Sequence, residues 1–199
     1  MLETTVWSSR LTGIVNVVGR EGIGKIYLSD GCPVTASYTS AGRAHHGMPA
    51  LKSILGLKEE KLAFRVESSV DHVLDHVRKI IGKVLKSKRP GIRATWIKNV
   101  DSFAADLSDR FENFIIRGVS GNIQSIALFK ERKLYTVIVL YPDSIRVSGL
   151  ILDGISHEHG LVDYEATDSS KVELFVEYKS EGIREYVLES MYRSGPRGS

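Results

Sequence analysis

Apolar residues recur at helical spacing in three stretches of the first half of the chain. They do so over residues 10–18, over residues 41–57 and over residues 70–85, so each stretch is predicted to be a helix. Gly56 is placed to end the second helix. Ser68 and Ser69 precede the third, which predicts a serine cap before its acidic first turn. The third stretch has apolar residues on one face and charged residues on the other, as expected for a helix that covers a core.

Two β-prone runs lie between the first two predicted helices. Residues 24–29 and 32–38 are joined by Asp30-Gly31, a dipeptide typical of two-residue hairpin turns because both residues tolerate positive φ. Residues 61–67 alternate apolar and charged side chains, which predicts a half-buried strand. The first part of the chain is therefore expected to form a helix, a hairpin, a helix and a strand.

The second half combines helical and strand patterns in a different order. A helix is predicted over residues 101–117 and a final helix over residues 183–192, while residues 154–170 are expected to form a long loop. Four β-prone runs are predicted as strands: residues 123–129, 134–141, 145–152 and 171–178. This order implies an antiparallel sheet flanked by helices.

These elements predict an α+β fold in two small domains. The first domain is expected over residues 1–86, and the second over residues 100–193. Residues 87–99 are interpreted as a basic connector, because Pro90-Gly91 ends the preceding helix. Residues 194–199 have no periodicity and are expected to form a disordered tail.

Composition narrows the class of protein. Of the 199 residues, 42% are hydrophobic and 26% are charged, values that predict a folded chain with a real core. Cys32 is the only cysteine, so neither an intrachain disulfide nor a thiolate metal cluster is expected. No signal peptide pattern and no apolar run of about 20 residues is present, so we expect a cytoplasmic protein that does not enter membranes.

Charge is distributed unevenly along the chain. Residues 70–100 contain eight lysines and arginines against two acidic residues, whereas residues 101–199 contain 11 against 16. Such a basic stretch attracts phosphates or an acidic protein surface, and a tryptophan within it can stack on a base. An alternative is an ordinary solvated helix end, or a docking segment for the acidic second domain. The candidate phosphate-binding or partner-binding residues are Lys83, Lys86, Lys88, Arg89, Arg93, Trp96 and Lys98.

A glycine-rich segment, residues 19–25, has the spacing of a phosphate-binding P-loop. Ile26 stands where the magnesium-binding hydroxyl belongs, and a strand follows instead of a helix, so we interpret the segment as a turn before the hairpin. Asp143 follows a β-prone run in the manner of a nucleotide hydrolase, but the intervening Pro142 favours a strand, a turn and a strand.

The six histidines form three pairs. His72 and His76 are four residues apart, so they share one face of the predicted helix and could bind zinc. The other pairs are His45-His46 and His157 with His159, and no pattern supplies a full ligand set. We therefore predict no metal, no cofactor and no catalytic residue, and we interpret the histidines as surface residues.

The first third of the chain resembles the PATAN domain, a small module attached to bacterial response regulators and present in archaeal proteins. The resemblance covers residues 8–67: the hairpin with its Asp30-Gly31 turn, the second predicted helix with Ala50-Leu51, and the aromatic-containing strand. Pro33 departs from the apolar residue that this family has there. The resemblance implies a signalling or protein-interaction role and transfers no catalytic residue.

The sequence therefore favours a non-enzymatic regulatory module that acts through a protein partner or a homodimer. The alternative is a nucleic-acid-binding accessory protein that uses the basic residues 78–98.

Overall fold

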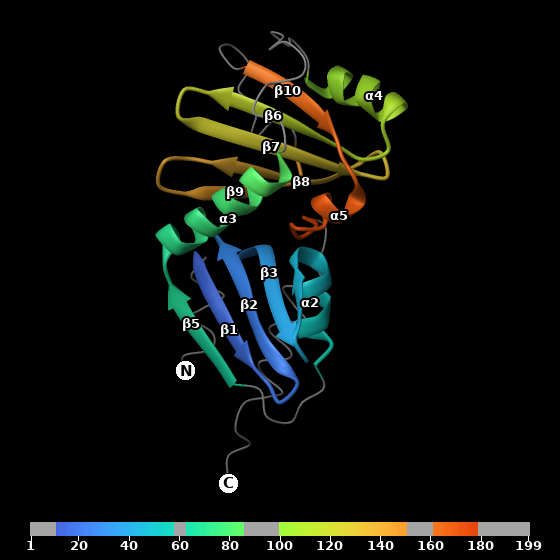
Figure 1. Cartoon of the computed structure of the whole chain (residues 1–199). Coiled ribbons are helices and arrows are strands. Elements are labelled where there is room, and N and C mark those ends of the chain that lie inside the picture. The colour runs from blue at the N-terminus through green and yellow to red at the C-terminus, as the bar shows by residue number, and fades with distance from the viewer. Residues whose placement is uncertain (1–10, 58–62, 86–99, 151–160, 179–199) are drawn as a thin grey trace. The chain divides into compact units, whose positions relative to one another are not determined.

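The described residues of the chain form a mixed α+β structure. The computed structural model describes residues 11–57, 63–85, 100–150 and 161–178, which contain two five-stranded antiparallel sheets and four helices (Figure 1). This confirms the predicted α+β class and the antiparallel sheet of the second half.

The described chain divides into two compact units. The first contains the described residues up to Val73 together with residues 173–176, and the second contains the remaining described residues, from Leu74 onward. The predicted connector, residues 87–99, lies outside the described residues, as do the predicted helix 183–192 and the tail 194–199.

The sheet of the first unit has the strand order β4-β3-β2-β1-β5, with every neighbouring pair antiparallel. Asp30 (φ 50°) and Gly31 (φ 76°) connect β2 to β3, which confirms the predicted hairpin. The strands are β1 (Gly13–Val18), β2 (Gly22–Ser29), β3 (Cys32–Ser40), β4 (Arg43–His46) and β5 (Ala63–Ser68).

The helix predicted over residues 10–18 is wrong, because this segment contains β1. Val15 and Val17 are buried on one face of the sheet, and Ile14 on the opposite face is also buried. A strand covered on both faces carries apolar residues at consecutive positions, and such a run contains helical spacings by coincidence. Its β-branched residues suit a strand that pairs with neighbours on both sides.

The helix predicted over residues 41–57 is confirmed only in its second part, α2 (Gly47–Leu55). Ala41 (φ 47°) and Gly42 (φ 75°) instead form a two-residue turn, which folds β4 back against β3. The apolar spacing of the predicted helix begins only at Met48, so the preceding residues were free to pair as a strand.

The start of α2 is tied to the segment 173–176. Gly47 has a φ of 63°, and an added Cβ there would overlap the backbone of Glu173 and Leu174. The N–H of Met48 donates to the carbonyl of Glu173 at 2.8 Å, so a backbone donor at the helix start finds its partner in a distant segment.

One face of the first sheet packs against α2, and Figure 1 shows this helix beside β3. Burying these side chains provides most of the free energy that holds α2 in place. The core consists of Val15, Val17, Ile26, Leu28, Ala36, Tyr38, Ala50, Leu51, Ile54 and Val176.

The amphipathic helix predicted over residues 70–85 is confirmed as α3 (Val70–Val84). The hydroxyl of Ser69 accepts the N–H of His72 at 3.4 Å, as expected for a serine cap. The buried residues of α3 are Val73, Leu74, Val77, Ile80, Ile81 and Val84.

The sheet of the second unit has the strand order β10-β6-β7-β8-β9. The predicted strands 123–129 and 134–141 are confirmed as β7 and β8, and the strand predicted over residues 145–152 is confirmed at its start as β9. The elements are α4 (Val100–Arg110), β6 (Phe114–Ser120), β7 (Ile123–Lys130), β8 (Lys133–Leu140), β9 (Ile145–Ser148), β10 (Leu161–Ala166) and α5 (Ser169–Val172).

The helix predicted over residues 101–117 is correct as far as Arg110, where α4 ends, and wrong beyond it. Phe114 begins β6 and stacks on Phe129 of β7, with ring centroids 4.2 Å apart and an interplanar angle of 10°. Phe114 and Ile115 matched the helical spacing only because successive residues of β6 are buried on both faces of the sheet.

The loop predicted over residues 154–170 is wrong where β10 pairs with β6. Asp163 lies opposite Arg117, and the Arg117 guanidinium contacts both oxygens of that carboxylate. Val162 points into the core beside α4. The alternation of residues 161–166 was a strand signal that the flanking polar residues concealed.

The strand predicted over residues 171–178 is also wrong, because it begins within α5. The Asp168 carboxylate accepts the hydroxyl of Ser170 and, at 3.2 Å, the N–H of Lys171. The hydrogen bond from Ser170 is the main cause that lowers the pKa of Asp168. This capping interaction starts a helical turn where propensity alone favoured a strand.

The two units share one topology. In each, four consecutive strands form a meander, and the fifth strand pairs with the outer side of the first. The hairpin β7–β8 turns through Glu131 (φ 52°) and Arg132 (φ 65°), the same left-handed conformation that Asp30-Gly31 adopts in the first unit.

A β-bulge occurs at the same place in both meanders. The register shifts between Tyr27 and Leu28 in the first unit and between Leu128 and Phe129 in the second, leaving Val34 and Tyr135 as the extra residues. Each extra residue uses its carbonyl in the same way: that of Val34 accepts the N–H of Val176 at 2.9 Å, and that of Tyr135 accepts the N–H of Tyr178 at 3.1 Å.

Candidate functional site

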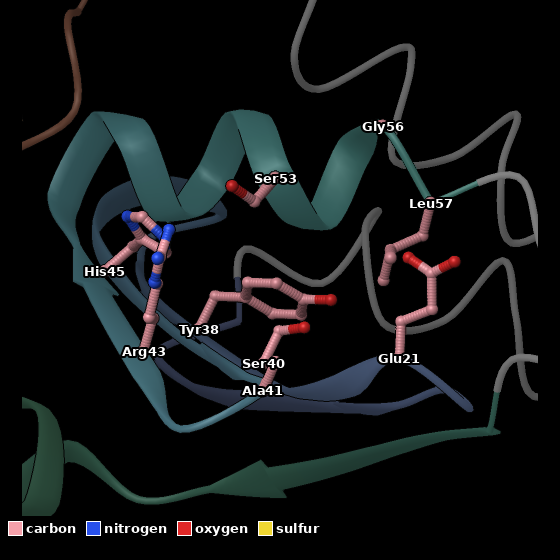
Figure 2. A pocket seen from close by; sticks show the side chains of 9 residues that line it. All are labelled: Glu21, Tyr38, Ser40, Ala41, Arg43, His45, Ser53, Gly56 and Leu57. Carbon is pink, nitrogen blue, oxygen red and sulfur yellow. The ribbon is translucent and has the colours of Figure 1, made fainter.

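An open pocket of about 620 Å³ lies in the first unit, between the β3–β4 hairpin and the C-terminal half of α2 (Figure 2). This volume falls within the range of small-ligand sites and is large enough to receive one or two side chains of a partner. The pocket is lined by Glu21, Tyr38, Ser40, Ala41, Arg43, His45, Ser53, Gly56 and Leu57.

The β3–β4 hairpin directs two basic side chains into this pocket. Arg43 pairs with Ser40 and His45 pairs with Tyr38, so these four side chains share one face of the sheet. Tyr38 belongs to the core that packs against α2, which places Arg43 and His45 on the helix side. Figure 2 shows both rising from β4 toward α2.

Tyr38 forms the floor of the pocket, and two glycines make room for it. Across the sheet, Gly24 pairs with Tyr38, and a Cβ added at Gly22 would lie 2.9 Å from the Tyr38 hydroxyl. A Cβ at Gly24 would lie 2.7 Å from Cδ1 and Cγ1 of Ile54, well inside van der Waals contact. Gly24 is therefore needed for the packing of α2 on the sheet, and Gly22 for the position of the Tyr38 ring beside it.

This packing accounts for the glycine-rich segment 19–25 without a phosphate. Lys25 lies within β2 and is exposed on the face away from α2, so it does not begin a helix. The predicted turn is confirmed for residues 19–21, which connect β1 to β2, and is wrong for residues 22–25, which belong to β2.

The polar groups of the pocket are mainly hydrogen-bond donors. The exposed side chains of Arg43 and His45 provide N–H groups, and Tyr38 and Ser40 provide hydroxyls. The Ser53 hydroxyl donates to the carbonyl of Pro49 at 3.0 Å. Figure 2 shows the Tyr38 and Ser40 hydroxyls directed toward the side of the pocket that Glu21 and Leu57 line.

This arrangement suits the binding of an acceptor-rich group. A planar guanidinium on an edge strand can hold a carboxylate or phosphate through two parallel hydrogen bonds. Neither Arg43 nor His45 has an ion pair or a side-chain hydrogen bond within the part of the chain that the structure describes. None of the described side chains therefore occupies either group, and Glu21 adds one acidic group to the pocket lining.

Most of the candidate binding residues singled out in the sequence lie outside the described residues, namely Lys86, Lys88, Arg89, Arg93, Trp96 and Lys98. Lys83 is exposed in the last turn of α3. Lys79 is exposed one turn earlier, and the Arg78 guanidinium donates to the carbonyl of Pro142 at 3.2 Å. The described part of the basic stretch is thus one exposed helical edge.

The histidine pairs occupy different places. His72 is exposed on α3 and His76 is half-buried, while His157 and His159 lie outside the described residues. No group of three metal-ligating side chains occurs among the residues that the structure describes. Of the four histidines that the structure describes, His45 lines the pocket.

Sequence reasoning missed this site because residues 41–57 were assigned to one helix. A helix would have sent Arg43 and His45 in different directions, whereas β4 sends both to the same face. The signal that could have identified them is Ala41-Gly42, a turn between two alternating segments.

Comparison of the chain with protein-family models, with curated protein sequences and with solved structures found no match. Within the described ranges, none of the helices is long and apolar enough to cross a bilayer.

Proposed function

We propose that this protein is a non-catalytic, regulatory protein-interaction module whose contact surface is the pocket beside the β3–β4 hairpin. One observation carries the proposal: Arg43 and His45 project from an edge strand into an open pocket, without side-chain partners among the described residues. Exposed basic side chains that converge on a concave surface are a common means of protein recognition.

Two further features support a binding role. All four residues of β4 are exposed, and this strand is the last in the sheet order, so none of the described strands pairs with its outer edge, where we expect a partner's backbone to bind. The resemblance of residues 8–67 to the PATAN domain implies a signalling or interaction role for the same region.

The experiment compares partners recovered by three forms of the full chain: wild type, Arg43→Glu and Lys25→Glu. Lys25 is the matched control, because its substitution changes the net charge equally on the opposite face of the same sheet. We expect the wild type and Lys25→Glu to recover the same partner, which must then bind the purified chain directly. Equal recovery by Arg43→Glu would refute the proposal.

A second candidate function, nucleic-acid binding, is favoured by the exposed cationic edge of α3. Lys79 and Lys83 are four residues apart and both exposed, and they lead into the basic residues 86–98. We expect any such binding to weaken steeply with salt and to fall when both lysines are changed to glutamate. Absence of binding to single-stranded and duplex DNA and to RNA at 50 mM salt would eliminate this function.

A further inference from the structure

We infer that the pocket receives a carboxylate from an acidic, extended segment of the partner protein. This inference rests on the proposed function and adds the chemistry of the ligand. It is argued from three properties of the described residues: the donors that converge in the pocket, the charge of β4, and the open backbone edge of that strand.

The donors match a planar anion. Arg43 presents a fork of N–H groups, and a carboxylate accepts two of them in parallel. His45 lies two residues away on the same face, and the hydroxyls of Tyr38 and Ser40 line the same pocket. Ala41 and Leu57 supply apolar contact for the methylene groups that carry an acidic side chain's carboxylate.

The charge of β4 argues against a second copy of this chain as the ligand of the pocket. The strand reads Arg-Ala-His-His and contains no acidic residue. The antiparallel self-pairing that uses all four residues would place Arg43 of each copy opposite His46 of the other. This arrangement provides no ion pair and places two basic side chains directly opposite each other. A segment with alternating acidic residues avoids this conflict.

The position of β4 favours an extended ligand. Directly across the two-residue turn, Ser40 and Arg43 form a hydrogen-bonded pair, so their backbone groups face each other. Successive residues of an antiparallel strand direct their backbone groups to opposite edges, so Ala44 directs its N–H and C=O to the edge of β4 that faces away from β3. A partner strand that pairs there would place every second side chain on the pocket side, next to Arg43 and His45.

The test uses the full chain and three synthetic peptides, each labelled with a fluorophore, whose binding is measured by fluorescence anisotropy at 50 mM salt. The first has the sequence Thr-Glu-Val-Glu-Val-Glu-Thr, and the second has glutamine in place of each glutamate. A third peptide carries phosphoserine in place of the central glutamate. The protein variants are Arg43→Glu, Arg43→Lys and the control Lys25→Glu, and their thermal unfolding is compared with that of the wild type.

We expect the glutamate peptide to bind at least about tenfold more tightly than the glutamine peptide. Arg43→Glu should weaken its binding about tenfold to a hundredfold, as expected for loss of a charge-assisted pair. Arg43→Lys should show an intermediate loss, because an ammonium keeps the charge but not the planar fork. Lys25→Glu should bind like the wild type.

Three results would overturn the inference. The first is equal binding of the glutamate and glutamine peptides, or no binding of either at millimolar concentration. The second is an equal loss in Arg43→Glu and Lys25→Glu. The third is tenfold tighter binding of the phosphoserine peptide, which would assign the pocket to phosphate. None of these results refutes the proposed function as a protein-interaction module. That proposal is tested separately, by comparing the partners that the wild type and Arg43→Glu recover.

Discussion

Two threonines at equivalent positions of the two meanders are expected to respond in opposite ways to the same substitution. Thr35 lies beside the bulge in β3, and Thr136 lies beside the corresponding bulge in β8. Both are almost fully buried, at 0% and 1% exposure. The Thr35 hydroxyl donates to the carbonyl of Leu174 at 2.6 Å. The Thr136 hydroxyl has no hydrogen-bond partner among the described residues.

Valine replaces the hydroxyl with a methyl group of similar size, so neither substitution opens a cavity. Thr35→Val removes the donor of the hydrogen bond to the Leu174 carbonyl. This loss should lower the free energy of unfolding by about 1–3 kcal/mol. Thr136→Val removes a buried hydroxyl that has lost its hydration, which should add about 1 kcal/mol.

Urea and thermal unfolding of both variants, followed by circular dichroism, measure these changes. For a chain of this length, each kcal/mol shifts Tm by about 2–4 °C, so the two variants should move in opposite directions by readable amounts. If Thr136→Val destabilised the protein as much as Thr35→Val, the Thr136 hydroxyl would have a partner in solution, and the reasoning from its burial would be wrong.

Three further predictions concern packing, an ion pair and pH. Gly24→Ala should destabilise the protein by about 1–3 kcal/mol, because the added methyl group overpacks against Ile54. Gly82→Ala, in α3 with open space around it, should stabilise the protein by about 0.5–1 kcal/mol. Urea unfolding measures both changes, and equal effects of the two substitutions would contradict the packing argument. The side chains of Arg117 and Asp163 are 23% and 15% exposed, so a double-mutant cycle on this pair should give a coupling free energy of about 1–2 kcal/mol in unfolding. A value near zero would show that the ion pair does not stabilise the pairing of β10 with β6. Burial raises the pKa of Tyr27 above 10.0, so the stability that the protonated phenol contributes is complete below pH 10 and is lost as the pH rises through the folded-state pKa. Tyr27→Phe should therefore lose less stability than the wild type above pH 10. Alkaline unfolding curves that run parallel for the two proteins would contradict this prediction.

The sequence was most informative where a local signal was strong. Asp30-Gly31 located the first hairpin, because its residues tolerate the left-handed conformation that such turns require. The amphipathic pattern after Ser69 located α3 nearly to its ends. The missing hydroxyl at Ile26 argued correctly against a P-loop at residues 22–25, which belong to a strand.

Local patterns failed where burial on both faces of a sheet produced consecutive apolar residues. Ile14 and Val15 in β1, like Phe114 and Ile115 in β6, are buried on opposite faces, and their spacing resembled that of a helix. Residues 161–166 have a short alternating pattern flanked by polar residues, and the strand that pairs with them, β6, is more than 40 residues away in the sequence, so a local pattern predicts a loop.

The candidate site depended on this same error. Arg43 and His45 come together only when Ala41-Gly42 turns the chain and β4 pairs with β3. The basic residues that the sequence did single out lie mostly outside the described residues, so the assignment of the basic stretch to nucleic acid stays a prediction.

By itself the sequence determined the α+β class, the first hairpin, α3 and the central strands of the second sheet, because turn chemistry and side-chain periodicity are local properties. Only the tertiary structure decided that both units share one topology, that residues 173–176 complete the first unit, and that two basic side chains line one pocket. Those features depend on pairing between distant segments, and the free energy of such pairing is not encoded in any short stretch of residues.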